Sequence, residues 1–188
     1  MPRRFRSFIV LFLLSLCTLH AKSDATRIDF YYGIAEGNYL IGDLRGAAKG
    51  VEQMLKLDAD YVPALTLSTR IKIDHCEPEV ALEAAERAIA LEPEDYERQL
   101  LKAHVLGNMN RHDDTFAIIE QVMQTAPIDG DDYRVASKLL GLLLMAQGDW
   151  DTAAETFNQI YLENPETAAI SLGLASEAYL EKAGNALN

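Results

Sequence analysis

The apolar and polar positions of the chain follow a helical period over most of its length. In residues 79–91 the apolar side chains recur every three to four positions, and charged side chains lie between them. The apolar stripe consists of Val80, Ala81, Ala84, Ala85, Ala88 and Leu91, and the opposite face of Glu79, Glu83, Glu86 and Arg87. This spacing predicts an amphipathic helix with one buried face. Pro63 and Pro78 suit the first turns of helices, where a missing N–H costs little.

The helical pattern returns at intervals of 34 residues. Pro93 and Pro127 are 34 positions apart, and each separates two helical stretches because proline cannot continue a helix. Pro165 follows after 38 positions, which predicts a four-residue insertion near residues 130–133. The repeating units cover residues 28–61, 62–95, 96–129 and 134–167, and a last helix over 168–183 and a tail over 184–188 follow them.

Three positions match across the four units. The small position of the first helix is occupied by Ala35, Thr69, Ala103 and Gly141. The small position of the second helix is occupied by Ala47, Ala81, Thr115 and Ala153. The bulky position four residues later is occupied by Val51, Ala85, Ile119 and Phe157. In this register the chain resembles the tetratricopeptide repeat (TPR) family. The resemblance implies an all-α fold, a right-handed α-solenoid of four TPR helix-turn-helix units plus a C-terminal capping helix, in a single domain over residues 28–183. Stacked units of this kind bury a continuous core that one hairpin cannot form alone.

The first 23 residues are typical of a secretory signal peptide. Arg3, Arg4 and Arg6 precede an apolar run over residues 8–19, which is too short to cross a bilayer. Small side chains predict cleavage between residues 21 and 25, and therefore an exported protein in the periplasm or the extracellular space. Two alternatives remain: an uncleaved membrane anchor, and a lipoprotein lipidated at Cys17, although Leu16 does not suit a lipobox.

The net charge of the chain excludes some classes of partner. Lys and Arg number 17 and Asp and Glu number 29, for a net charge of −12. This balance argues against a nucleic-acid partner and against a basic membrane-docking surface. Cys76 is the one cysteine beyond the signal segment, so no internal disulfide is expected in the exported chain.

Motifs for catalysis or metal binding are not evident in the sequence. The adjacent His75 and Cys76 lack the spacing of a structural zinc site. The acidic turn at residues 129–132 lacks the ligand spacing of a calcium-binding loop. We therefore expect no enzymatic activity, no metal, no cofactor and no small-molecule substrate.

The TPR resemblance implies a concave groove lined by the first helix of each unit. The residues expected there are Asp29, Tyr32, Glu36, Tyr39, Thr66, Arg70, Ile73, Glu97, Leu100, His104, Lys138, Leu142 and Met145. The early positions are acidic and aromatic and the late ones apolar, which suits a peptide or helix with a basic end and apolar anchors. The alternative is that Tyr39, Leu142 and Met145 are core or cap contacts. Asp29 and Glu36 disfavour a receptor for terminal carboxylates.

Together these patterns predict an exported TPR scaffold that binds a partner protein. A role in cell-envelope assembly is suggested by analogy with the fold alone. One alternative is a structural protein that self-associates through residues 168–183, where apolar side chains interrupt the polar face expected of a cap. Another is a lipid-anchored envelope lipoprotein.

Overall fold

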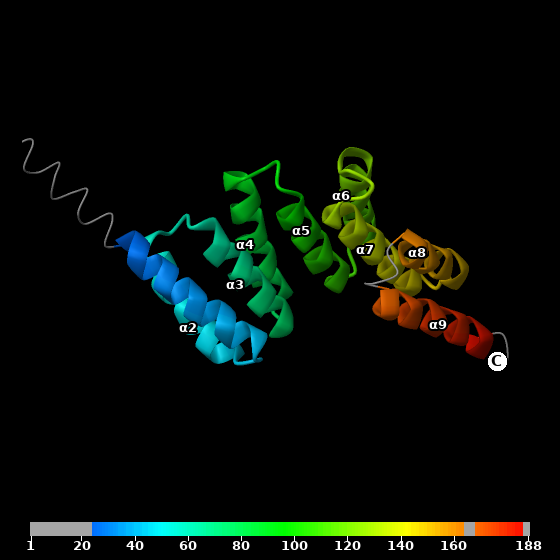
Figure 1. Ribbon diagram of the computed structural model, residues 1–188, viewed down its shortest axis with the longest axis horizontal. Coiled ribbons are helices and arrows are strands. Elements are labelled where there is room, and N and C mark those ends of the chain that lie inside the picture. Colours follow the sequence, from blue (N-terminus) through cyan, green and yellow to red (C-terminus); the bar gives the residue numbers. More distant parts are fainter. Residues whose placement is uncertain (1–23, 164–167, 186–188) are drawn as a thin grey trace, which may run out of the picture. The chain divides into compact units, whose positions relative to one another are not determined.

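The computed structural model describes residues 24–163 and 168–185, and within these residues the regular secondary structure is helical, without a strand. The predicted signal segment over residues 1–23, with Cys17, lies outside the described residues, as does Pro165. A first helix over residues 24–40 is followed by α2 (Leu44–Leu57), α3 (Val62–Asp74), α4 (Pro78–Leu91), α5 (Tyr96–Asn108), α6 (His112–Thr125), α7 (Asp131–Gln147), α8 (Trp150–Glu163) and α9 (Ala168–Asn185) (Figure 1).

Local sequence signals set the ends of these helices. Pro63 and Pro78 lie in the first turns of α3 and α4, as predicted. The Asp43 carboxylate caps α2 by accepting a hydrogen bond from the Gly46 N–H at 2.9 Å. Gly148 ends α7 in the left-handed conformation at φ 80°, which glycine adopts without steric cost. α7 begins at Asp131, three residues before the expected start of the fourth unit.

Two compact units divide the chain between His75 and Cys76. In the first unit, the helix over residues 24–40 packs with α2 and α3 around a small-residue core. Its buried members are Ile28, Ala35, Ala47, Val51, Met54, Ala64, Leu67 and Ile71. The helices approach closely here: a Cβ atom at Gly50 would lie 2.6 Å from the Ala35 Cβ, so only glycine fits at this crossing.

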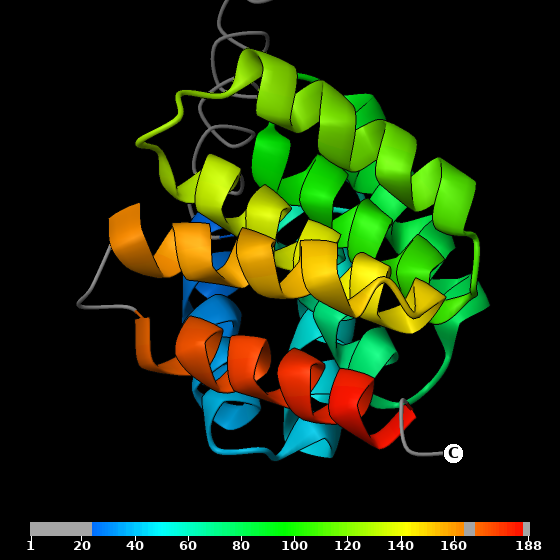
Figure 2. The same cartoon turned by 90° about the vertical axis from the view of Figure 1, so that its right-hand side faces the viewer.

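In the second unit, α4 packs on α5, α5 on α6 and α7, α6 on α7, and α7 on α8. Figure 2 shows α9 beside α8, and the two helices share a core cluster of Ala153, Ala154, Phe157, Ile160, Ala175 and Ala178. Another cluster joins α5, α6 and α7 through Leu100, Ala103, Ile119, Val122, Ala126, Ala136 and Leu143. Each helix thus buries its apolar face against its sequence neighbours.

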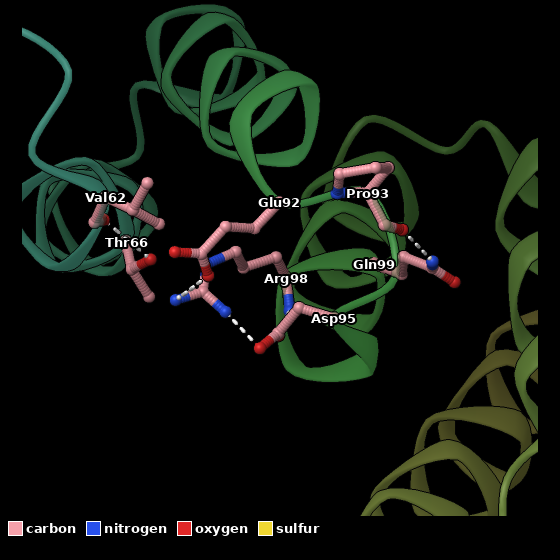
Figure 3. A network of polar contacts seen from close by, with 7 residues as sticks. All are labelled: Val62, Thr66, Glu92, Pro93, Asp95, Arg98 and Gln99. Carbon is pink, nitrogen blue, oxygen red and sulfur yellow. Dashed lines mark hydrogen bonds and ion pairs between the residues drawn. The ribbon is translucent and has the colours of Figure 1, made fainter.

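A polar network fixes the connection between α4 and α5. The Arg98 guanidinium, only 12% exposed, pairs with Glu92 at 3.0 Å and with Asp95, which also accepts a hydrogen bond from the Arg98 N–H (Figure 3). The Gln99 amide donates to the Pro93 carbonyl at 2.7 Å. These contacts satisfy polar groups where Pro93 interrupts helical hydrogen bonding.

Candidate functional site

In the first unit, one face of the first helix carries four of the predicted binding residues, Asp29, Tyr32, Glu36 and Tyr39. Asp29 and Glu36 are exposed, whereas the two tyrosines are half-buried. The Tyr32 hydroxyl donates a hydrogen bond to Glu36 Oε1 at 3.3 Å. The face therefore alternates carboxylates with aromatic rings.

Residues of α3 and its N-terminal end complete this face. Burial raises the pKa of the Tyr32 phenol, the charge of Glu36 and the hydrogen bond to it raise the pKa further, and Arg70 on α3 lowers it. Burial likewise raises the pKa of Tyr39, with a further rise from a hydrogen bond to Asp74 at the end of α3. These influences place Arg70 and Asp74 close to the tyrosines of the first helix.

Tyr61, the residue before α3, joins the same group. Burial raises its pKa, and the nearby Asp29 and Asp58 carboxylates raise it further. We call this set the tyrosine–carboxylate face, and it comprises Asp29, Tyr32, Glu36, Tyr39, Asp58, Tyr61, Arg70 and Asp74. Four carboxylates and one guanidinium act on the three phenols. An excess of negative charge beside aromatic rings suits a cation, through ion pairing and cation–π contact.

The second unit holds an apolar pocket of about 280 Å³ between α5, α6 and α7, which we call the α5–α7 pocket. Its lining residues are Ala103, His104, Gly107, Asn108, His112, Thr115, Leu139, Leu142, Leu143 and Ala146. His104 and Leu142 were predicted binding residues, and both are exposed to solvent. A cavity of this chemistry binds an apolar group and orients it through a few polar neighbours.

The other predicted residues lie in different surroundings. Leu100 is 3% exposed and belongs to the core of α5, α6 and α7, so it is not available to a partner. Thr66 is also buried, and its hydroxyl donates to the Val62 carbonyl of its own helix at 3.0 Å (Figure 3). Met145 packs against the Phe157 cluster.

The remaining predicted binding residues contact solvent but do not line the pocket. Glu97 and Lys138 are exposed, and Ile73 is half-buried.

Some residues of both sites were not predicted. Tyr61 precedes its helix and therefore falls outside the periodic positions of the unit. His112 and Thr115 belong to α6, a second helix of a unit, whereas the resemblance assigns binding to the first helices. His112 and Thr115 follow directly after the turn that joins α5 to α6. Treating the end of α5 and the start of α6 as one surface would have included both residues.

The turn between α3 and α4 carries His75 and Cys76. Cys76 is exposed and adopts φ 57°. Within residues 24–163 and 168–185, His, Cys, Asp and Glu form no group of three or more that could hold a metal ion. None of the helices in the described part of the chain combines the length and apolar character needed to cross a bilayer.

Comparison with known proteins bears on the fold. Neither a protein-family model nor the sequence of a curated protein matches the chain. Among solved structures, MamA is similar at 21% identity and a TM-score of 0.59, over 82% of this chain and 84% of that one. YrrB, described as a TPR protein with an unusual peptide-binding site, is similar at 17% identity and a TM-score of 0.56, over 81% and 76%. The chain has the TPR fold.

A third TPR-like structure, PilW, is described as a widely conserved type IV pilus biogenesis factor. It shares 18% identity with this chain at a TM-score of 0.63, over 81% of this chain and 74% of its own. The TPR fold explains why the helices pair as hairpins and pack on their neighbours. It also explains why small residues such as Gly50 and Gly141 lie at helix crossings.

Proposed function

We propose that the protein is an interaction module that binds a segment of a partner protein and catalyses no reaction. The observation that carries this proposal is the tyrosine–carboxylate face. Its half-buried rings offer contact area at low entropic cost, and its carboxylates attract positive charge. The segment bound on this face therefore contains lysine or arginine.

The fold supports a binding role. Stacked repeat hairpins form extended concave surfaces that bind partners. YrrB, of the same fold, is described by its peptide-binding site. Fold likeness alone does not fix function, so the residues of the face are the stronger support.

Selection from a displayed library of random peptides on the full chain tests the proposal. We expect enriched peptides to carry basic and apolar residues. Glu36→Lys and Asp29→Lys together should weaken the selected peptides at least about tenfold, because each reversal replaces an attraction by a repulsion. Fluorescence anisotropy with labelled peptides measures the affinity.

A matched control separates the face from the overall charge. Glu83 is exposed on α4, and Glu83→Lys combined with Glu79→Lys makes the same change in net charge outside the face. This control should retain nearly the wild-type affinity at 0.15 M salt, where distant charges are screened. Enrichment of no peptides, or equal losses in both double variants, would contradict the proposal.

We also propose that residues 1–23 direct export and are removed, so that the module acts in the cell envelope. PilW provides an example of this fold in a pilus biogenesis factor. Mass spectrometry of the protein recovered from envelope and cytoplasmic fractions tests this step. A mature N-terminus between residues 21 and 25 in the envelope is expected; an intact N-terminus in the cytoplasm would refute export, and a lipid-modified Cys17 would favour the lipoprotein alternative.

A second candidate function is self-association through α9. Tyr179 and Leu180 are 49% and 73% exposed on this terminal helix. If these side chains form a dimer contact, Tyr179→Ser with Leu180→Ser should convert a dimer to a monomer in light scattering. A wild-type protein that is already monomeric at 100 µM, roughly the range of weak association, would exclude this candidate.

A further inference from the structure

The α5–α7 pocket has the capacity of a single large side chain. Its volume of about 280 Å³ lies just below the range of roughly 300–1,000 Å³ that is common for small-molecule sites. Six of its lining residues are apolar or lack a side chain: Ala103, Gly107, Leu139, Leu142, Leu143 and Ala146. The apolar lining suits an apolar side chain of a partner.

Two small residues, Gly107 and Ala146, keep part of this pocket open, although neither position requires a small side chain. A Cβ atom at Gly107 would lie 3.9 Å from Thr115, an ordinary contact distance, so alanine fits there. Glycine inside a helix costs about 1 kcal/mol relative to alanine. Ala146 is exposed and also has room for a larger side chain. At Gly107 and Ala146 the open volume is therefore not a packing requirement.

His112 supplies a polar group in the lining. Its Nδ1 atom is buried and has no hydrogen-bond partner among the described residues. A buried polar atom without a hydrogen-bond partner destabilises the fold. Exceptions of this kind are found most often at functional sites. A turn of the imidazole about its Cβ–Cγ bond, whose torsional well is broad, would present this nitrogen to an occupant. An occupant with an N–H or O–H group would satisfy it.

We propose that the α5–α7 pocket holds one tryptophan or tyrosine side chain of the partner protein, with His112 accepting a hydrogen bond from its N–H or O–H. This inference rests on the proposed function and names an anchor residue of the partner protein. Aromatic side chains fill such pockets with large apolar area and a polar tip. They also dominate the binding energy of protein interfaces.

NMR titration of the full chain with N-acetyl-tryptophanamide, N-acetyl-phenylalaninamide and N-acetyl-lysinamide tests the pocket. The tryptophan amide should shift the signals of His104, His112 and Leu142. It should bind about two- to tenfold more tightly than the phenylalanine amide, the factor that one net hydrogen bond provides. His112→Phe should abolish this preference while the phenylalanine amide still binds. Equal binding of both amides to the wild type would overturn the role of His112.

A pocket-filling variant tests the volume itself. Gly107→Leu should lower the affinity for the tryptophan amide at least tenfold, and its Tm should not fall below that of the wild type. Gly173→Leu is the matched control, because a Cβ atom at Gly173 of α9 meets nothing within 4 Å. It should bind like the wild type. Unchanged binding by Gly107→Leu, or no shifts around the pocket in the wild type, would overturn the proposal.

These results are distinguishable from failure of the proposed function. If the amides do not bind but selected peptides still lose affinity on charge reversal of Asp29 and Glu36, only the pocket assignment is wrong. If the tryptophan amide binds at His112 but the library yields no peptide, the interaction role is wrong and the pocket remains an aromatic-binding site.

Discussion

Gly141 and Phe157 show at the residue scale how the hairpins close. The Phe157 ring is fully buried, and a Cβ atom at Gly141 would lie 2.5 Å from it. The ring thus packs directly on the backbone of α7. Gly37 in the first helix is the opposite case, since a Cβ atom there meets nothing within 4 Å.

The two glycines should respond oppositely to alanine. Gly141→Ala should destabilise the protein by about 1–3 kcal/mol, because the ring must move in a packed core. Gly37→Ala should stabilise it by about 0.4–1 kcal/mol, because alanine restricts the unfolded chain and fits the helix. Urea denaturation measures both. A gain of stability in Gly141→Ala would show that Phe157 does not occupy this position.

The tyrosines of the tyrosine–carboxylate face report its charge. Burial is the main reason for the raised pKa of Tyr32, and Glu36 raises it further. Glu36→Gln should therefore lower the pKa of Tyr32 and leave that of Tyr39, which responds to Asp74, nearly unchanged. NMR titration of the Tyr ring signals measures both values. An equal decrease at both tyrosines would contradict the arrangement of the face.

The same shifts predict alkaline destabilisation of the first unit. A raised pKa means that the folded state binds the phenolic proton more tightly than the unfolded state. The contribution of Tyr32, Tyr39 and Tyr61 to the free energy of unfolding is therefore fully present below the ordinary tyrosine pKa of 10.0. It is lost as the pH rises through their higher pKa values in the folded state. Tyr61→Phe should reduce this loss, measured as the Tm difference between pH 9 and pH 11, two values that bracket the ordinary tyrosine pKa of about 10.

At the scale of the element, caps determine where helices begin. Asp43→Ala should destabilise the protein by about 1 kcal/mol, because the Gly46 N–H loses its acceptor at the start of α2. Asp43→Asn should cost much less, since asparagine caps almost as well. Thermal unfolding of both variants checks this, and equal losses would mean that the cap hydrogen bond is not the cause.

The helices were largely predictable from sequence, whereas the binding residues were only partly so. Period, proline and glycine positions are local signals, and they placed α3 and α5 at the starts of their expected units. Leu100 lies at the edge of its apolar stripe, and helical period alone does not say whether such a residue faces the core or a partner. His112 lines the pocket only because of the way α6 packs against α5 and α7. That packing is a tertiary property, which the sequence of a single helix does not encode.

At the scale of the whole molecule, the helices of each compact unit depend on their neighbours in that unit. Phe157→Ala should cost about 3–5 kcal/mol, because it removes a fully buried ring from the cluster that joins α8 to α9. Hydrogen exchange with mass spectrometry should show the largest loss of protection in α8 and α9 and a smaller one in α4, the first helix of the same unit, since stabilisation passes between adjacent repeats. Uniform loss over the chain would contradict this neighbour-by-neighbour dependence.

The proposed function requires a basic partner segment to bind on the tyrosine–carboxylate face. NMR mapping of a selected peptide on the full chain tests it most directly. The ring signals of Tyr32, Tyr39 and Tyr61 should shift on binding, and the shifts should disappear with the Asp29→Lys and Glu36→Lys double variant. Tight binding that leaves all three tyrosine signals unchanged would contradict the claim.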